Sequence, residues 1–305
     1  MLAIPTVIVA VLLARSLHGR QAGLLGVKLS ATPTAVATVS IPPRATTIAA
    51  PPPTATAAVA TVPRVPLTEL HNVIDPLAGS YNVYVEDLTT GAHFDINADH
   101  ASVAASVIKL PIAITLLQAQ SEGQLDLSSK ITPKPDQILD YGTGSIRYDA
   151  AGTSYTLRDL LTRLIKQSDN SAAQILTDLL GADKVQRRID GWGLTQTKLQ
   201  DDVSSPQDVG KLLVMLYQHK VLNPKQSLEL MGLMTNTDFE DRIPQPLPKY
   251  VEVSHKIGTE ADGVINDAAI VMLPGHPYVI CIFSQGTSQD EATPALQHIS
   301  QTVFD

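Results

Sequence analysis

Ser106 and Lys109 have the residue types and the spacing of a serine nucleophile with its own base. On a helix, residues three apart lie on one face and within reach of each other. A neutral Lys109 amine there would accept the proton of the Ser106 hydroxyl, as nucleophilic catalysis requires. A solvated helix face is the alternative for an isolated pair. The small and apolar neighbours favour a buried helix start instead, where an unpaired lysine is costly.

Two further groups follow in chain order, a Ser-Asp-Asn triplet at 168–170 and a Lys-Ile-Gly triplet at 256–258. Lys256 offers a positive charge for a substrate carboxylate. Gly258 lets a substrate backbone lie against a strand. Two roles stay open for Asn170: its amide binds a substrate amide, or it caps the helix that follows.

The ordered set Ser-x-x-Lys, Ser-Asp-Asn and Lys-x-Gly resembles that of penicillin-binding proteins and class A β-lactamases, and the resemblance covers the chain from about residue 67 to 305. It implies that Ser106 is acylated, that Lys109 holds its proton, and that Ser168 relays a proton to the leaving nitrogen. It also implies an oxyanion hole formed by the backbone N–H groups of Ser106 and Thr259. Lys256 would then be a second cation near Ser168.

Two other positions bear on substrate binding. Tyr141 matches the place where an aromatic residue often walls the site in this family, and packing of this loop tyrosine on its own helix is the alternative. Ile257 replaces the hydroxyl residue that is usual between the lysine and the glycine. The change removes a hydrogen bond to a substrate carboxylate unless Thr259 substitutes for it.

The segment 199–206 departs most from the family pattern. Class A β-lactamases carry a glutamate there that activates the deacylating water, whereas the sequence has no glutamate between Glu122 and Glu229. Asp201 or Asp202 is the available substitute. Two adjacent acids before a helix are more typical of a solvated first turn, so we expect slow deacylation.

The order of elements predicts an α+β fold. By the resemblance it is β-lactamase/transpeptidase-like: a five-stranded antiparallel sheet built from both chain ends, flanked by helices, with an all-helical subdomain. Pro111, one turn into the Ser106 helix, predicts an irregular or bent first turn. The patterns predict helices at 67–77, 106–121, 157–166, 172–180, 183–190, 206–219, 224–234 and 291–304, and strands at 81–88, 92–97, 251–255, 268–273 and 278–283, with a break at 256–259.

Composition limits the partners. The chain is 44% hydrophobic and 17% charged, as expected of a soluble protein. Residues 1–66 carry five Lys or Arg and no acid, which leaves 17 basic against 30 acidic residues, a balance of −13, in the remainder. Nucleic acid is therefore excluded as a partner. One cysteine, Cys281, precludes an internal disulfide. We expect a monomer with no metal and no cofactor.

The N-terminal region indicates export. Residues 1–14 are uninterruptedly apolar but fall short of the ~20 residues that a spanning helix needs, so 1–26 is interpreted as a signal peptide or a membrane anchor. Residues 27–66 are rich in Pro, Thr and Ala and form a disordered linker or tether. The serine hydrolase domain is then 67–305, placed outside the cell, in the cell envelope or in the periplasm.

These inferences predict an exported serine hydrolase of the β-lactamase family. Its Ser106 acyl-enzyme would form with β-lactams, with slow turnover, or with peptidoglycan stem peptides that end in D-alanine. The alternatives are a D-Ala-D-Ala carboxypeptidase or esterase with no useful β-lactamase activity, and a non-catalytic domain that binds the cell wall. A glutaminase-like use of the same Ser-Lys fold agrees less well with export.

Overall fold

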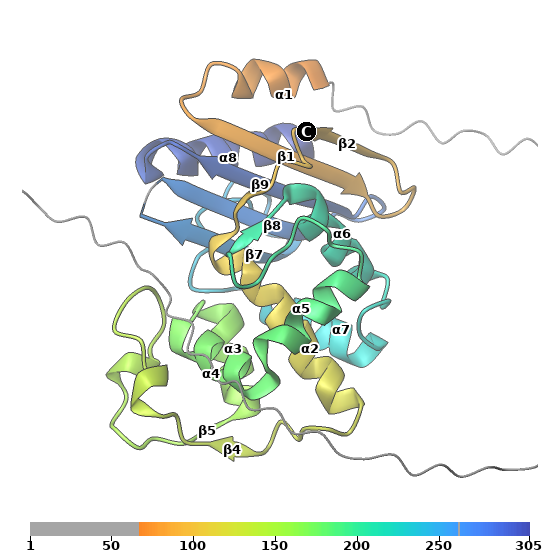
Figure 1. Cartoon of the computed structure of the whole chain (residues 1–305). Helices are drawn as coiled ribbons and strands as arrows, with labels where there is room; N and C mark the ends of the chain where they lie inside the picture. The colour runs from red at the N-terminus through yellow and green to blue at the C-terminus, as the bar shows by residue number, and fades with distance from the viewer. Residues whose placement is uncertain (1–66, 262) are drawn as a thin grey trace, which may run out of the picture. The chain divides into compact units, whose positions relative to one another are not determined.

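The computed structural model describes residues 67–261 and 263–305 (Figure 1). The predicted signal peptide or anchor at 1–26 and the predicted linker at 27–66 lie outside the described residues. Within the described part, no helix combines the length and the apolar character needed to cross a membrane.

One antiparallel sheet combines strands from both ends of the described chain. Its strand order is β2-β1-β9-β8-β7, so the C-terminal strand β9 pairs directly with the N-terminal strand β1. This arrangement confirms the predicted fold class. The strands are β1 (Ser80–Asp87), β2 (His93–Ile96), β7 (Glu252–Glu260), β8 (Val264–Met272) and β9 (Tyr278–Gln285).

Apolar side chains fill both faces of the sheet. In β9, Ile280 and Ile282 belong to a cluster with helices α1 (Leu67–Ile74) and α8 (Gln289–Phe304). Cys281 and Phe283 alternate with them and belong to the larger cluster formed with the helical half. A strand covered on both faces is apolar throughout, and this explains the continuous apolar run of β9.

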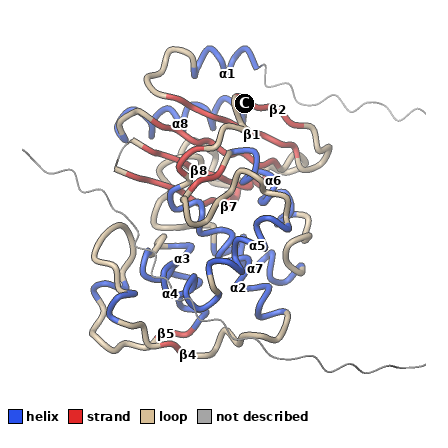
Figure 2. Tube along the Cα trace, in the orientation of Figure 1, coloured by secondary structure: helices blue, strands red, loops and turns tan. Residues whose placement is uncertain are grey.

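The helical half lies on the other side of the sheet from α1 and α8 (Figure 2). Its central helix α2 is buried over most of its length, which agrees with its lack of a polar face. Side-chain caps begin two of these helices: Thr156 accepts the Asp159 N–H, and Ser205 accepts the Asp208 N–H. The helices are α2 (Lys109–Ser121), α3 (Leu157–Lys166), α4 (Asn170–Leu180), α5 (Ala182–Gly191), α6 (Pro206–Tyr217) and α7 (Pro224–Leu233).

Short elements connect these helices. They comprise two small strand pairs and three turns of 3-10 helix. The pairs are β3 (Ser102–Val103) with β6 (Val203–Ser204), and β4 (Lys130–Ile131) with β5 (Tyr155–Thr156). The turns are η1 (Ala105–Ile108), η2 (Pro135–Gln137) and η3 (Ile146–Tyr148).

The predicted break at 256–259 is wrong. Strand β7 continues to Glu260 and β8 begins at Val264, because each residue of this stretch has a partner across the pair, from Lys256 opposite Ala268 to Glu260 opposite Val264. Gly258 lies in the middle of the paired stretch. A glycine inside a strand often marks a close backbone approach rather than an end.

Gly258 is where the sheet touches the nucleophile turn. A Cβ atom built on it would lie 2.6 Å from the Ala104 carbonyl oxygen and 3.3 Å from the Ser106 nitrogen. The first distance is too short for carbon against backbone oxygen. Only a residue without a side chain therefore lets β7 and η1 pack at this separation.

We predict that Gly258→Ala lowers the free energy of unfolding by about 1–3 kcal/mol, the usual cost of overpacking. Gly232→Ala is the matched control, because Gly232 lies within α7 with nothing within 4 Å of its built Cβ. There alanine should be neutral or stabilising, by about 1 kcal/mol at most. Urea unfolding of both variants measures the difference, and equal stabilities would contradict the close contact.

Candidate active site

Ser106 lies in the 3-10 turn η1, and the regular helix α2 begins only at Lys109. This confirms the irregular first turn that Pro111 predicts. The preceding residue, Ala105, has a φ of 49°, a backbone conformation that non-glycine residues rarely adopt. Such strain persists where the surrounding structure enforces it, and it clusters at functional sites.

The Lys109 amine is the point at which the first two sequence motifs meet. It is buried and donates to Ser106 Oγ at 2.9 Å, to Asn170 Oδ1 at 2.7 Å and to Ser168 Oγ at 3.2 Å. It also donates to the Ser168 carbonyl oxygen. The predicted Ser106–Lys109 pair is therefore within hydrogen-bond distance, and a single amine holds three predicted site residues together.

The surroundings of Lys109 favour its neutral form. Burial lowers its pKa to about 7, although the carboxylates of Asp169, Asp202 and Glu260 oppose the shift. At neutral pH a substantial fraction of the amine therefore carries a lone pair. That lone pair is what a base acting on the Ser106 hydroxyl needs.

The Ser-Asp-Asn triplet gives each residue a separate task. Asp169, not Asn170, is the N-cap of α4, because its carboxylate accepts the Ala172 N–H at 2.9 Å. The capping alternative for Asn170 is therefore wrong. Asp169 also accepts the Ile146 N–H at 2.9 Å, which anchors the loop before α3. Asn170 is left to contact Lys109.

A loop containing two glycines covers the triplet. A Cβ on Gly142 would lie 2.1 Å from the Asn170 side-chain nitrogen, and one on Gly144 would lie 2.1 Å from the Asp169 carboxyl carbon. Both glycines have positive φ. Between them, the Thr143 carbonyl accepts the Asn170 N–H at 3.1 Å. The loop thus fixes the triplet through backbone contacts that a side chain would block.

The Lys256 amine is the second amine that donates a hydrogen bond to the Ser168 hydroxyl. Its Nζ donates to Ser168 Oγ at 2.9 Å and to the Ile257 carbonyl at 3.0 Å. Burial and then the neighbouring Lys109 charge hold the Lys256 pKa well below its ordinary value. Ser168 Oγ therefore lies between two amines, a suitable position for relaying a proton.

Two residues that the sequence analysis missed fix the strand beside Ser106. Arg242 donates to the Gly258 carbonyl at 2.8 Å and to Thr259 Oγ1 at 2.5 Å. Asn266, on β8, donates to the carbonyls of Val103 and Ala104 just before the nucleophile turn. Both are distant in sequence from the motifs, so no local pattern indicates them. Ile257 is buried and offers no hydroxyl.

A cavity of about 380 Å³ opens at the nucleophile. The predicted Tyr141 lines it and is 62% exposed, which places it at the cavity wall rather than packed on its own helix. Other polar or charged residues that line the cavity include Ser106, Lys109, Asn170, Asp202 and Glu260. A pocket with a few convergent polar groups is the usual form of a small-molecule site.

Asp202 differs from its neighbour Asp201. Asp201 is exposed, as a solvated turn predicts, but Asp202 lines the cavity, and its Oδ1 is buried with no hydrogen-bond partner. Its φ of 52° is again the strained left-handed conformation. Burial, followed by the Glu260 charge, raises the pKa of Asp202 to about 7. The solvated-turn interpretation is therefore wrong for Asp202.

Comparison with known proteins agrees with this geometry. The family described as "Beta-lactamase enzyme family" matches residues 67–305. The chain belongs to the beta-lactamase enzyme family. Among curated proteins it is similar to β-lactamase VEB-1 of Pseudomonas aeruginosa, with 28% identity over 62% of this chain and 71% of that protein. ROB-1 of Haemophilus influenzae is 28% identical over 70% of this chain and 75% of its own.

Solved structures extend the likeness of this beta-lactamase-family chain to penicillin-binding proteins. PBP-A superposes with a TM-score of 0.73 at 25% identity, covering 78% of this chain and 93% of that one. A point mutant of PBP-A, solved as an acyl-enzyme complex with penicillin G, gives a TM-score of 0.72 at 25% identity, covering 78% of this chain and 94% of that one. The fold and the serine hydrolase class are thereby shown.

Proposed function

We propose that the protein is an exported serine hydrolase that forms a Ser106 acyl-enzyme with β-lactams or with peptidoglycan peptides ending in D-alanine. The observation that carries the proposal is the 2.9 Å separation of Lys109 Nζ and Ser106 Oγ beside an open cavity, which lets the Ser106 hydroxyl donate to the amine when the amine is neutral. The penicillin adduct of the PBP-A mutant supports the same chemistry in a similar fold.

Acylation uses groups that are already in place. Ser106 Oγ attacks the carbonyl carbon while neutral Lys109 takes the hydroxyl proton. The developing oxyanion is held by the backbone N–H groups of Ser106 and Thr259, which come from segments in contact at Gly258. Each such donor is typically worth ~3 kcal/mol of barrier. The C–N bond then breaks, Ser168 gives its proton to the leaving nitrogen, and Lys109, which donates to Ser168 Oγ, returns to Ser168 the proton taken from Ser106.

Substrate recognition rests on the remaining polar groups. Asn170 binds the substrate amide through its side-chain amide. Lys256 is buried, is not among the residues that line the cavity, and donates to Ser168, so we assign it to the proton relay through Ser168 rather than to the substrate carboxylate. The Thr259 hydroxyl, held by Arg242, replaces the hydroxyl that Ile257 lacks. Tyr141 forms an outer wall of the cavity.

Asp202 is the group that best fits deacylation. Water that attacks the Ser106 ester needs a base within hydrogen-bond reach. The Oδ1 atom of Asp202 is a buried acceptor without a hydrogen-bond partner, and Asp202 lines the same cavity, which has room for a water molecule. With a pKa of about 7 it is only partly ionised at neutral pH. We therefore propose hydrolysis that is slow but dependent on Asp202.

A D-Ala-D-Ala carboxypeptidase or esterase without useful β-lactamase activity remains the second candidate, because it differs only in deacylation. Export is supported by the apolar run at 1–14 and the Pro-rich stretch that follows. Anchoring to the membrane through that run is part of the proposal. Cell fractionation of the full-length chain decides its location.

Ser106→Ala should abolish covalent labelling by a fluorescent penicillin. It removes the hydroxyl that lies within hydrogen-bond distance of Lys109, in the turn that packs against Gly258 of β7. The thermal midpoint should stay nearly unchanged, since Lys109 keeps its hydrogen bonds to Ser168 and Asn170. Ser128→Ala, at an exposed serine away from the cavity, is the control. Labelling of Ser106→Ala at the wild-type rate would show that the nucleophile is another residue.

Asp202→Asn should prolong the penicilloyl adduct roughly 10²-fold, because general-base assistance typically contributes at least that much. Asp201→Asn is the matched control, with the same charge change at the adjacent exposed position. In the wild type, hydrolysis should rise as the pH increases through about 7, because the ionised form of Asp202 is the base. Intact-mass measurements over time follow the adduct. Equal adduct lifetimes in the two variants would exclude Asp202 as the base.

A further inference from the structure

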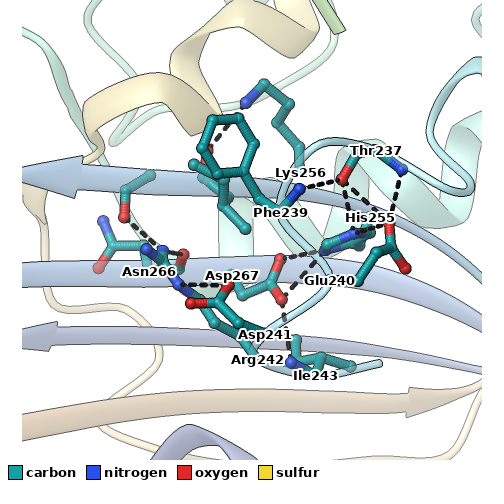
Figure 3. Close-up of polar contacts among 12 residues, drawn as sticks. Thr237, Phe239, Glu240, Asp241, Arg242, Ile243, His255, Lys256, Asn266 and Asp267 are labelled. Atoms are coloured by element: carbon teal, nitrogen blue, oxygen red, sulfur yellow. Dashed lines mark hydrogen bonds and ion pairs between the residues drawn. The ribbon is translucent and has the colours of Figure 1, made fainter. Parts of the chain in front are cut away.

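A set of charged side chains lies behind β7, on the face opposite Lys256 (Figure 3). His255 precedes Lys256 in this strand, so the two side chains project to opposite faces. His255 and Asp267, a residue of β8, are both completely buried. The segment 237–243, which joins α7 to β7, supplies the other members of the set.

Both ring nitrogens of His255 face carboxylates. Nδ1 lies 3.0 Å from Asp267 Oδ1, and Nε2 lies 3.1 Å from Glu240 Oε1. A neutral imidazole has one N–H, so the lone pair of its other nitrogen would face a carboxylate oxygen, whereas an imidazolium donates to both. The geometry therefore favours the charged ring. Burial opposes the charge, but Asp267 and then Glu240 raise the His255 pKa to about 9.

The imidazolium links the sheet to the segment 237–243. On the sheet side, Asp267 also accepts the Ile243 N–H through Oδ2 at 3.1 Å. On the segment side, Glu240 accepts the backbone N–H of Thr237 at 2.6 Å. The two carboxylates thus hold both ends of the segment, and His255 joins them.

Arg242 lies between these two anchors. Its buried guanidinium donates to the carbonyls of Gly258 and Asn266 and to Thr259 Oγ1. The nearest carboxylate, that of Asp241, is 3.8 Å from its Nε. No closer ion pair fixes Arg242 among the residues that the structure describes. Its position against the end of β7 therefore depends on the segment that His255 holds.

We propose that His255 is a positioning residue for the acylation site: its imidazolium pins the segment 237–243 to the sheet, so that Arg242 fixes Gly258 and Thr259 beside Ser106. The inference rests on the proposed function, because it takes this strand end to be part of the acylation site. Groups held in place speed a reaction by removing the cost of orienting them.

The charges around His255 make its attachment of the segment 237–243 to the sheet dependent on pH. Asp267 faces the ring from β8, and Glu240 and the Thr237 hydroxyl face it from the segment. The Met234 carbonyl takes the His255 backbone N–H. Loss of the ring proton leaves two carboxylates that no longer share a cation.

The sign of the stability effect follows from the raised pKa. The folded-state pKa of His255 is about 9, above the value of an exposed histidine. The stabilisation is therefore fully present below about pH 6.5 and is lost as the pH rises through about 9. Acylation should fall over the same alkaline range.

The test uses two variants, because replacing a fully buried ring risks the fold. Glu240→Gln changes a residue whose side chain is 41% exposed and removes one of the two carboxylates. His255→Gln removes the cation itself. Asp238→Asn is the matched control, since Asp238 is an exposed acid of the same segment without a side-chain contact to His255. Each variant is assayed for acylation by a fluorescent penicillin and for thermal midpoint across pH.

Glu240→Gln should move the alkaline fall of both acylation and thermal midpoint to lower pH, with Asp238→Asn unchanged. His255→Gln should slow acylation roughly tenfold or more, because small displacements of positioned groups are costly, and should lose the pH dependence near about 9. The proposal would be overturned if His255→Gln folds and is acylated at the wild-type rate. It would also be overturned if acylation and thermal midpoint of Glu240→Gln fall at the same alkaline pH as in the wild type.

Amide hydrogen exchange separates this proposal from the proposed function. If the wild type is not acylated at all, the acyl-enzyme proposal fails. The proposed clamp, in which His255 holds the segment 237–243 and Arg242 fixes Gly258 and Thr259, is then tested by the exchange rates of the Gly258 and Thr259 amides alone. Faster exchange at these amides in Glu240→Gln, with Asp238→Asn unchanged, supports the clamp. Identical exchange in the two variants overturns it.

Discussion

The burial of the Lys109 amine is the constraint on which the rest of the structure depends. A buried ammonium is costly, so the fold supplies acceptors from two segments: Ser106 from the nucleophile turn, and Ser168 and Asn170 from the triplet. The same desolvation makes the amine neutral enough to act as a base. The burial that makes the ammonium costly is therefore also what lowers the pKa of Lys109 to about 7.

The helices, caps and strands that local sequence patterns determine were predictable from the sequence. Thr156 and Ser205 cap helices at the expected positions, and apolar runs such as β9 are central strands. Prediction failed where tertiary contact overrides local preference. Gly258 suggests a break in a strand, yet pairing with β8 carries the strand through it. Asn170 is a good cap by type, but Asp169 has the backbone geometry for the role.

The site divides along the same line. Ser106, Lys109 and Lys256 stand in recognisable spacings, and the structure brings them to one cavity or to a shared hydroxyl. Arg242 and Asp202 have no spacing that marks them. Arg242 matters because it donates to the end of β7, and Asp202 matters because it lines the cavity. Their role is a property of the fold, since the same residues on an open loop would be ordinary solvated charges.

The pairing of β1 with β9 has a consequence for how the chain acquires its activity. These neighbours lie about two hundred positions apart in sequence, and contacts of such separation form late because a long loop must close first. The strand that carries Lys256 joins β1 only through β8 and β9. A chain that ends before β7 therefore has its nucleophile but not its second amine. Competence for acylation arises in one step, at the completion of folding.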